Sequence, residues 1–211
     1  MLRLSSASLS IIASLMLCTA AGAATNAEAP RRVIDDAMQQ VLQILKTENL
    51  DLADRKAKIE NVAYANFDFD RMSKLVLARN RRAMTPAQFE EFRVEFRKHL
   101  SLTYGSRLNS YNDEKIEVGA AEERRNGTYA VKTTIVGGKA DGAVIEYRLR
   151  EVEGKWLVFD VIIEGVSLIG NFRSQIQDII SSKGIEQLNQ LLRERNEERE
   201  REATTEAAAA S

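Results

Sequence analysis

One uninterrupted apolar segment, residues 156–163, limits the folds open to this chain more than any other feature. Seven of its eight residues are apolar, and the single exception is Asp160. A strand with one side in solvent alternates apolar and polar residues. The segment therefore predicts a strand that is covered on both faces, or one that faces a core on one side and an apolar cavity on the other.

Three further strands are predicted before this segment, at residues 115–121, 129–136 and 144–152. The first and third alternate apolar and polar side chains, and a turn at residues 125–127 joins the first two. Glycine-containing connections join the others. Strands that follow one another through such short connections pair as neighbours, so the sequence predicts a four-stranded antiparallel meander.

Helices are predicted before and after the sheet. Apolar residues recur at helical spacing in residues 30–46 and 86–104, and the second of these helices begins at Thr85, an N-cap residue that a proline follows. Asp70 is the predicted N-cap of a short helix at residues 71–77. The remaining helices are predicted at residues 51–66, 172–182 and 185–195. Helices, then a meander, then helices indicate an α+β fold.

The two ends of the chain differ from the predicted domain at residues 24–196. Residues 1–23 combine a positive N-terminus, an apolar stretch too short to cross a bilayer and an Ala-Gly-Ala site, which predicts a cleavable secretory signal peptide. An uncleaved anchor and a lipoprotein modified at Cys18 are the alternatives. Residues 197–211 have alternating charges and then alanines, without an apolar stripe, and they predict a disordered tail.

The residue types argue against most enzyme chemistry and against a nucleic-acid partner. The only cysteine lies in the predicted signal peptide, and the only histidine is His99, which is predicted on a helix surface. No metal site and no cysteine–histidine pair is therefore predicted. The charges are nearly balanced, with 30 lysines and arginines against 31 aspartates and glutamates. A nucleic-acid-binding domain favours a strong basic excess.

Two carboxylates remain as candidates for acid–base chemistry, Asp160 in the apolar strand and Glu164 just after it. The structural interpretation is favoured, because ion pairs perturb carboxylates as readily as catalysis does. In that interpretation Asp160 pairs with Arg148 or Arg150, and Glu164 accepts backbone N–H groups at a turn.

Apolar side chains suggest a binding function more strongly than the two carboxylates suggest catalysis. The helix at residues 86–104 and the strands at residues 144–152 and 156–163 offer more apolar faces than one sheet–helix layer needs. On periodicity alone an ordinary core is the better interpretation of these faces, and a ligand cavity is the alternative.

A resemblance to a known family favours the cavity. The motifs that carry it are Trp156, Asp160-Val161, Glu164-Gly165-Val166-Ser167-Leu168 and Asn171-Phe172-Arg173-Ser174-Gln175, preceded by Phe69-Asp70-Arg71-Met72-Ser73 and Thr85-Pro86-Ala87-Gln88-Phe89. In this order they resemble the MlaC, or toluene-tolerance, family of periplasmic phospholipid carriers. The resemblance extends over residues 30–192.

The resemblance implies a periplasmic lipid carrier without catalytic activity or cofactor. Its fold would be a sheet with helices packed around a deep apolar pocket for the acyl chains. Its partners would be phospholipid, an outer-membrane lipoprotein–porin complex, and an inner-membrane ABC transporter with a periplasmic lipid-channel ring, and its role would be to maintain outer-membrane lipid asymmetry. The residues expected to contact lipid are Leu75, Val76, Phe92, Phe96, Ile145, Tyr147, Leu149, Phe159, Val161, Ile163, Val166 and Leu168.

The chain departs from the family pattern at residues 78–82. The family usually has glycine and then aromatic residues here, whereas this chain has Ala-Arg-Asn-Arg-Arg. Arg79, Arg81 and Arg82, together with Arg148, are candidates for contacts with a head group or a partner; a solvated charged face is the alternative. The departure also keeps open a carrier for hopanoid-like lipids. A small cavity enzyme that uses Asp160 or Glu164 and a lipid-free adapter are separate alternatives.

Overall fold

The computed structural model describes residues 20–105 and 114–209. The predicted signal peptide therefore lies outside the described residues except for residues 20–23, which begin the first helix. None of the helices in the described ranges is long and apolar enough to cross a membrane.

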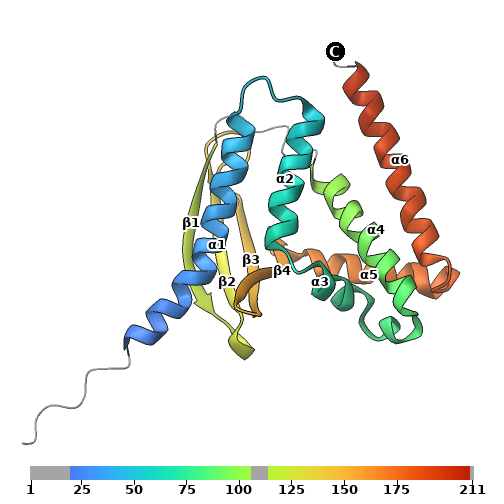
Figure 1. Cartoon of the computed structure of the whole chain (residues 1–211), viewed down its shortest axis with the longest axis horizontal. Helices are drawn as coiled ribbons and strands as arrows, with labels where there is room; N and C mark the ends of the chain where they lie inside the picture. Colours follow the sequence, from blue (N-terminus) through green and yellow to red (C-terminus); the bar gives the residue numbers. More distant parts are fainter. Residues whose placement is uncertain (1–19, 106–113, 210–211) are drawn as a thin grey trace, which may run out of the picture.

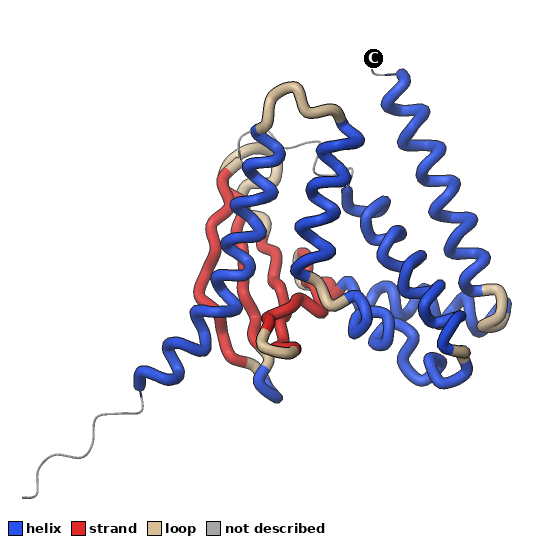
Figure 2. Tube along the Cα trace, viewed as in Figure 1, coloured by secondary structure: helices blue, strands red, loops and turns tan. Residues whose placement is uncertain are grey.

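The sheet confirms the predicted meander and extends it by one strand. Its order is β1-β2-β3-β4-β5, and every neighbouring pair is antiparallel (Figures 1 and 2). The additional strand has two residues, too short to show a periodicity. The strands are β1 (Lys115–Glu123), β2 (Tyr129–Val136), β3 (Val144–Val152), β4 (Lys155–Ile163) and β5 (Val166–Ser167).

A bulge in β4 explains the uninterrupted apolar segment. Arg148 pairs with Asp160 and Leu149 pairs with Val158, so Phe159 is the extra residue between them. Because side chains alternate along a strand, the extra residue moves odd-numbered positions after the bulge onto the face that even-numbered positions occupied before it. One sheet face therefore carries four apolar side chains of β4, which are Trp156, Val158, Val161 and Ile163.

Tight turns set the register of β4. Glu153 and Gly154, between β3 and β4, both have positive φ, at +50° and +78°. Glu164 and Gly165, between β4 and β5, repeat the pattern at +50° and +83°. Two-residue turns with positive φ at both positions match the twist of antiparallel strands.

The helices largely follow the predicted positions, and their caps are specific. Thr85 makes a full capping box with Gln88, as the Thr-Pro pair predicted. The prediction of Asp70 as N-cap was wrong: Asp68 accepts the bond from the Arg71 N–H at 2.9 Å, and Asp70 pairs with Lys74 inside the helix. The helical elements are α1 (Ala20–Lys46), α2 (Leu52–Asn66), α3 (Phe69–Leu77), η1 (Ala78–Ala83), α4 (Pro86–Tyr104), η3 (Arg125–Gly127), α5 (Leu168–Lys183) and α6 (Leu188–Ala209).

The last helix differs from the sequence prediction. Residues 197–209 continue α6, where a disordered tail was predicted. This stretch contains alanine, glutamate and arginine, which are good helix formers even without an apolar stripe. The first of these turns also contact α4, because Glu200 pairs with Lys98 at 2.8 Å and Arg199 donates to the Thr103 hydroxyl at 2.6 Å.

Two apolar clusters make up the core. The sheet cluster lies between α1 and the sheet and centres on Ile34, Val131, Leu149 and Val158. The helical cluster lies among α3, α4, α5 and α6 (Figure 1). Two partly buried side chains, Phe67 and Leu168, pack against both clusters. The molecule is therefore a sheet layer and a helical bundle that meet along a narrow junction.

Ala78 adopts a backbone conformation that suits glycine. It lies between α3 and η1 with φ +50° and ψ −127°, at the position where the resembling family usually has glycine. A side chain at such angles strains the backbone by roughly 1–3 kcal/mol. We expect Ala78→Gly to raise the free energy of unfolding by about 1 kcal/mol, measured by urea denaturation.

Ala83→Gly is the matched control for this prediction. Ala83 ends the same 3-10 segment and is not among the positive-φ residues. Glycine there only increases the freedom of the unfolded chain, so a loss of about 0.5–1 kcal/mol is expected. Equal effects of the two substitutions would show that Ala78 is not strained.

Candidate apolar binding site

The residues predicted to contact lipid divide between the two clusters. Ile145, Tyr147, Leu149, Val161 and Ile163 lie together in the sheet cluster. Leu75, Val76, Phe92 and Phe96 lie in the helical cluster, and Leu168 contacts both. The structure therefore brings one strand-based group together and places the other group in a separate core.

Two of the predicted contacts lie in neither cluster. Val166 is 59% exposed in β5, and Phe159 is the half-buried bulge residue of β4. The resemblance implied both contacts, whereas the turn and the bulge leave these two side chains outside the clusters. Neither residue belongs to the apolar site developed below.

Apolar packing is incomplete where α2 lies beside α1. No residue of α2 is buried, although the helix has 15 residues and lies against α1 and β4. Its apolar side chains Ile59, Val62 and Tyr64 are all half-buried. Helices in globular proteins usually close their apolar face against a core. This helix leaves its apolar face only partly covered.

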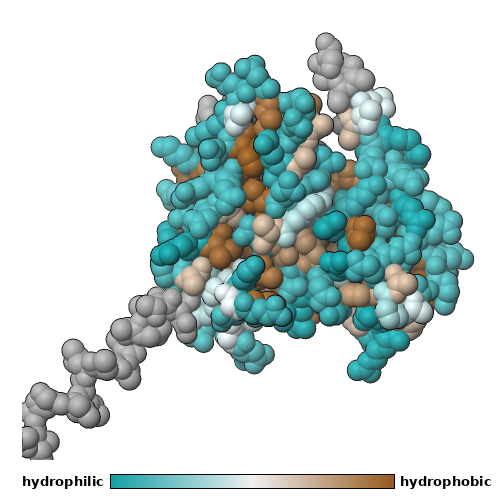
Figure 3. Space-filling model, in the orientation of Figure 1, coloured by the Kyte–Doolittle hydropathy of each residue, from teal (hydrophilic) through white to brown (hydrophobic). Residues whose placement is uncertain are grey.

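The second half of α1 shows the same incomplete burial. Ile34 and Ala37 are buried, whereas Val41, Ile44 and Leu45 further along α1 are half-buried. The α1–α2 seam is the name used below for Val41, Ile44, Leu45, Ile59 and Val62. Figure 3 shows apolar side chains gathered along the line where α1 and α2 meet, within a mostly hydrophilic surface.

The seam and the sheet cluster together form the candidate site. Partly buried side chains of the sheet cluster, Ile145 and Ile163 among them, continue it toward the sheet. The weak periodicity of residues 51–66 hid the α2 contribution from sequence reasoning. The three-residue spacing of Ile59 and Val62 was the available signal for it.

The most pronounced hollows formed by the described residues, of about 350 and 470 Å³, lie along α6 and not at the apolar site. Polar and charged side chains line them, including Arg195, Glu198 and Glu202. An elongated apolar ligand would therefore enter the candidate site only if α1 or α2 moved away from the sheet.

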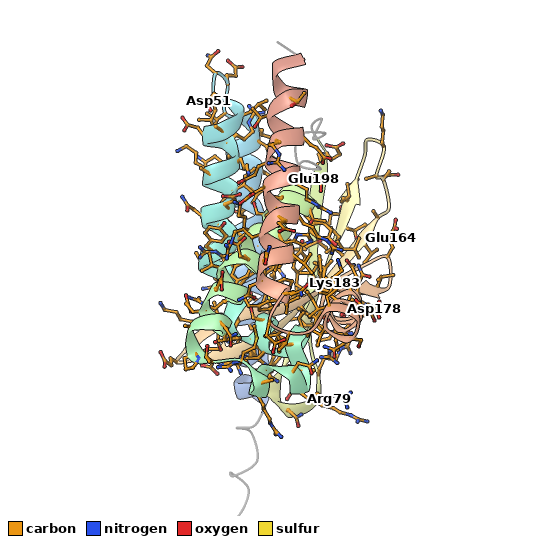
Figure 4. The ribbon with its side chains drawn as sticks, turned by 90° about the vertical axis from the view of Figure 1, so that its right-hand side faces the viewer. Asp51, Arg79, Glu164, Asp178, Lys183 and Glu198 are labelled. Carbon is orange, nitrogen blue, oxygen red and sulfur yellow. The ribbon has the colours of Figure 1, made fainter. Side chains whose placement is uncertain are left out.

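Asp160 is held by structural bonds, as the favoured interpretation predicted. The carboxylate accepts the Ser167 hydroxyl at 2.7 Å and the Ile169 N–H at 3.2 Å, and Arg148 approaches it at 3.5 Å. It thereby ties β3, β4 and the start of α5 together. Glu164 is exposed at the turn after β4 and, among the described residues, does not form a catalytic pair with Asp160 (Figure 4).

The four candidate arginines fall into different environments. Arg148 pairs with Glu146 at 3.2 Å and with Asp160, on the sheet face opposite to the sheet cluster. Arg81 lies 4.1 Å from the centre of the Phe89 ring and donates to the Met84 carbonyl at 3.1 Å. Arg79 and Arg82 are exposed, and Figure 4 shows Arg79 at the end of the molecule opposite to Asp51. Of the four arginines, only Arg79 and Arg82 make no hydrogen bond or ion pair with other described residues.

His99 is buried, so its predicted place on a helix surface was wrong. It is 5% exposed, because α6 packs beside α4 and covers it. Its Nδ1 lies 2.8 Å from Oδ1 of Asn196, which is itself completely buried and donates to the Glu95 carbonyl. Burial lowers the pKa of His99, and the nearby Arg199 and Arg195 lower it further. The hydrogen bond to Oδ1 of Asn196 raises this pKa and offsets part of the effect.

The lowered pKa of His99 predicts acid sensitivity. The unfolded chain binds the proton more readily than the folded protein does. The contribution of His99 to the free energy of unfolding is therefore fully present above pH 6.5 and is lost as the pH falls below that value toward the folded pKa. For a single proton the slope cannot exceed about 1.4 kcal/mol per pH unit. Urea denaturation between pH 7.5 and 5 measures it, and His99→Gln is expected to flatten the profile. An unchanged slope in that variant would assign the acid sensitivity to other groups.

The protein is thus an α+β protein with an incompletely closed apolar face between α1, α2 and the sheet. The chain belongs to the MlaC protein family, whose sequence profile matches residues 35–194. The described residues contain no group of three or more His, Cys, Asp or Glu side chains that could hold a metal ion.

Individual relatives agree with this assignment. The chain is 29% identical to toluene tolerance protein ttg2D of Pseudomonas putida over 118 residues, which are 56% of this chain and 55% of that protein. The match thus spans about half the length of this relative. The fold is similar to that of a phospholipid-binding protein from Ralstonia solanacearum, solved in complex with a phospholipid, with a TM-score of 0.73 and 22% identity. That similarity covers 81% of this chain and 98% of the other.

Proposed function

We propose that this protein is a periplasmic carrier that binds phospholipid between α1, α2 and the inner face of the sheet. The observation that carries the proposal is the half-buried apolar seam, in which a 15-residue helix lies over the core without burying any of its residues. Membership of the MlaC family and the phospholipid in the Ralstonia solanacearum structure support a lipid as the ligand.

The energetics of such a site require partner proteins. A two-chain lipid has on the order of 30 methylenes, and burial of each stabilises the complex by about 0.8 kcal/mol, or roughly 24 kcal/mol in all. The practical ceiling for non-covalent binding is about 18–21 kcal/mol, so opening the seam and ordering the lipid must offset part of this. A lipid held so tightly does not leave unaided, and its release requires a partner that opens the site.

The proposed partners are membrane complexes at the two ends of a transport route. They are an outer-membrane lipoprotein–porin complex and an inner-membrane ABC transporter with a periplasmic lipid-channel ring, and the transport would maintain outer-membrane lipid asymmetry. The predicted signal peptide supports the periplasmic location. Arg79 and Arg82 are the proposed docking contacts, because both are exposed.

The enzyme alternative has little support from the site. All the bonds recorded for Asp160 are structural, and Glu164 is exposed. A general acid or base has to reach a substrate proton. The hopanoid alternative is decided by the identity of the bound lipid.

Native mass spectrometry of protein purified from the periplasmic fraction tests the proposal. The full chain, with its own N-terminus, is expressed in a Gram-negative host that also makes hopanoids, and bound lipid is extracted and identified. We expect one adduct at a phospholipid mass. A hopanoid adduct would replace the proposed ligand, and folded protein without any adduct would overturn the carrier proposal in favour of an adapter.

A further inference from the structure

Two hydroxyl groups lie inside the otherwise apolar sheet cluster. Thr133 of β2 is 1% exposed and Tyr147 of β3 is 7% exposed. Val131 pairs with Tyr147 and Thr133 pairs with Ile145, so the two hydroxyl-bearing residues are diagonal neighbours on adjacent strands. Both lie on the sheet face that packs against α1.

The hydrogen bonds of this pair are incomplete. Two hydroxyls contribute two donor protons, and the Thr133 hydroxyl lowers the pKa of Tyr147, as a donor to its oxygen would. The Tyr147 proton is then directed at Sδ of Met38 on α1, at 4.0 Å. A thioether sulfur is a weak acceptor. Burial raises the pKa of Tyr147, so its hydroxyl stays a neutral donor.

A buried donor without a good acceptor is costly. Leaving such a group unsatisfied costs about 1–3 kcal/mol. Met38 is half-buried and unbranched, and it lies on α1, one of the two helices whose movement would admit a ligand. The donor therefore becomes available to a ligand when the Met38 side chain leaves the sheet.

We propose that the Tyr147 hydroxyl, positioned by Thr133, donates a hydrogen bond to an acyl ester carbonyl of the bound lipid. Ester carbonyls are the acceptors that a diacyl lipid brings next to its apolar chains. The inference rests on the proposed function and goes beyond it, because it assigns the protein a preference for ester-linked over ether-linked lipid. A hydrocarbon-only site would not distinguish the two.

Competition between two matched lipids tests the inference. Delipidated protein is incubated with equal amounts of diacyl and dialkyl phosphatidylethanolamine of identical chain length, and native mass spectrometry gives the ratio of the two bound forms. One hydrogen bond corresponds to an expected ester preference of about 3- to 10-fold in the wild type. Tyr147→Phe is expected to reduce the ratio to near one without lowering the melting temperature.

Two further variants separate positioning from packing. Thr133→Val keeps the shape and removes the second hydroxyl, so a partial loss of the preference is expected. Tyr129→Phe removes a tyrosine hydroxyl from the same strand as Thr133, beside Trp156, and is expected to keep the wild-type ratio.

The outcomes distinguish this inference from the proposed function. Lipid binding with no ester preference in the wild type, or with the full preference in Tyr147→Phe, would overturn the inference alone. Failure of the folded wild type to bind either lipid would overturn the carrier proposal, and the inference with it.

Discussion

Replacing Ile163 with tryptophan is expected to abolish most lipid loading while leaving the protein folded. Ile163 is half-buried at the end of β4, pairs with Ile145 and belongs to the sheet cluster. The larger side chain would occupy space that the lipid is proposed to use. Overpacking alone costs only about 1–3 kcal/mol, too little to empty a site of the affinity estimated above, so the expected loss depends on the tryptophan side chain excluding an acyl chain from the site. Native mass spectrometry of the purified variant measures the loaded fraction.

Ile163 is preferred to Val161 for this test. Val161 faces the same side but is only 6% exposed, so tryptophan there would threaten the fold itself. Ile162→Trp is the matched control: Ile162 is the adjacent half-buried residue, faces the other side of the sheet and belongs to neither cluster. Normal loading in a folded Ile163→Trp protein, or an equal loss in Ile162→Trp, would show that the lipid does not lie against this face.

The strand pattern shows how far sequence reasoning reaches in this protein. The four strands, their antiparallel order and the Thr85 cap all depend on local periodicity or local turn chemistry, and all were predictable. The unbroken apolar run of β4 predicts a strand covered on both faces, or one between a core and an apolar cavity. The bulge at Phe159 places four of its apolar residues on one face, and no periodicity argument can locate that bulge, because it depends on how β3 pairs with β4.

Long-range packing accounts for the remaining errors. His99 lies three residues after Phe96 on α4, and it is buried because α5 and α6 pack over it, with the Phe172 ring 5.6 Å away and Asn196 at 2.8 Å. Asp68 caps α3 in place of the predicted Asp70, and its carboxylate also pairs with Arg150 on β3, at 2.9 Å. The apolar seam was missed for the same reason: α2 has weak periodicity, and its role follows from its position beside α1.

Asp160 joins the two halves of the molecule, and Asp160→Ala is expected to lower the free energy of unfolding by about 2–4 kcal/mol. The substitution removes the acceptor of the Ser167 hydroxyl and of the Ile169 N–H, and it takes away one partner of Arg148. It also removes a negative charge from the N-terminus of α5, where such a charge is favourable. Leu168, one of the two side chains shared by the clusters, lies between Ser167 and Ile169.

Urea denaturation of three variants separates these contributions. Asp160→Asn keeps one acceptor oxygen and is expected to recover part of the loss. Glu164→Gln neutralises an exposed carboxylate just after the same strand, and a change within about 0.5 kcal/mol is expected. If Asp160→Ala were as stable as Glu164→Gln, the buried carboxylate would not hold α5 to the sheet. The junction between the clusters would then depend on the apolar contacts of Phe67 and Leu168.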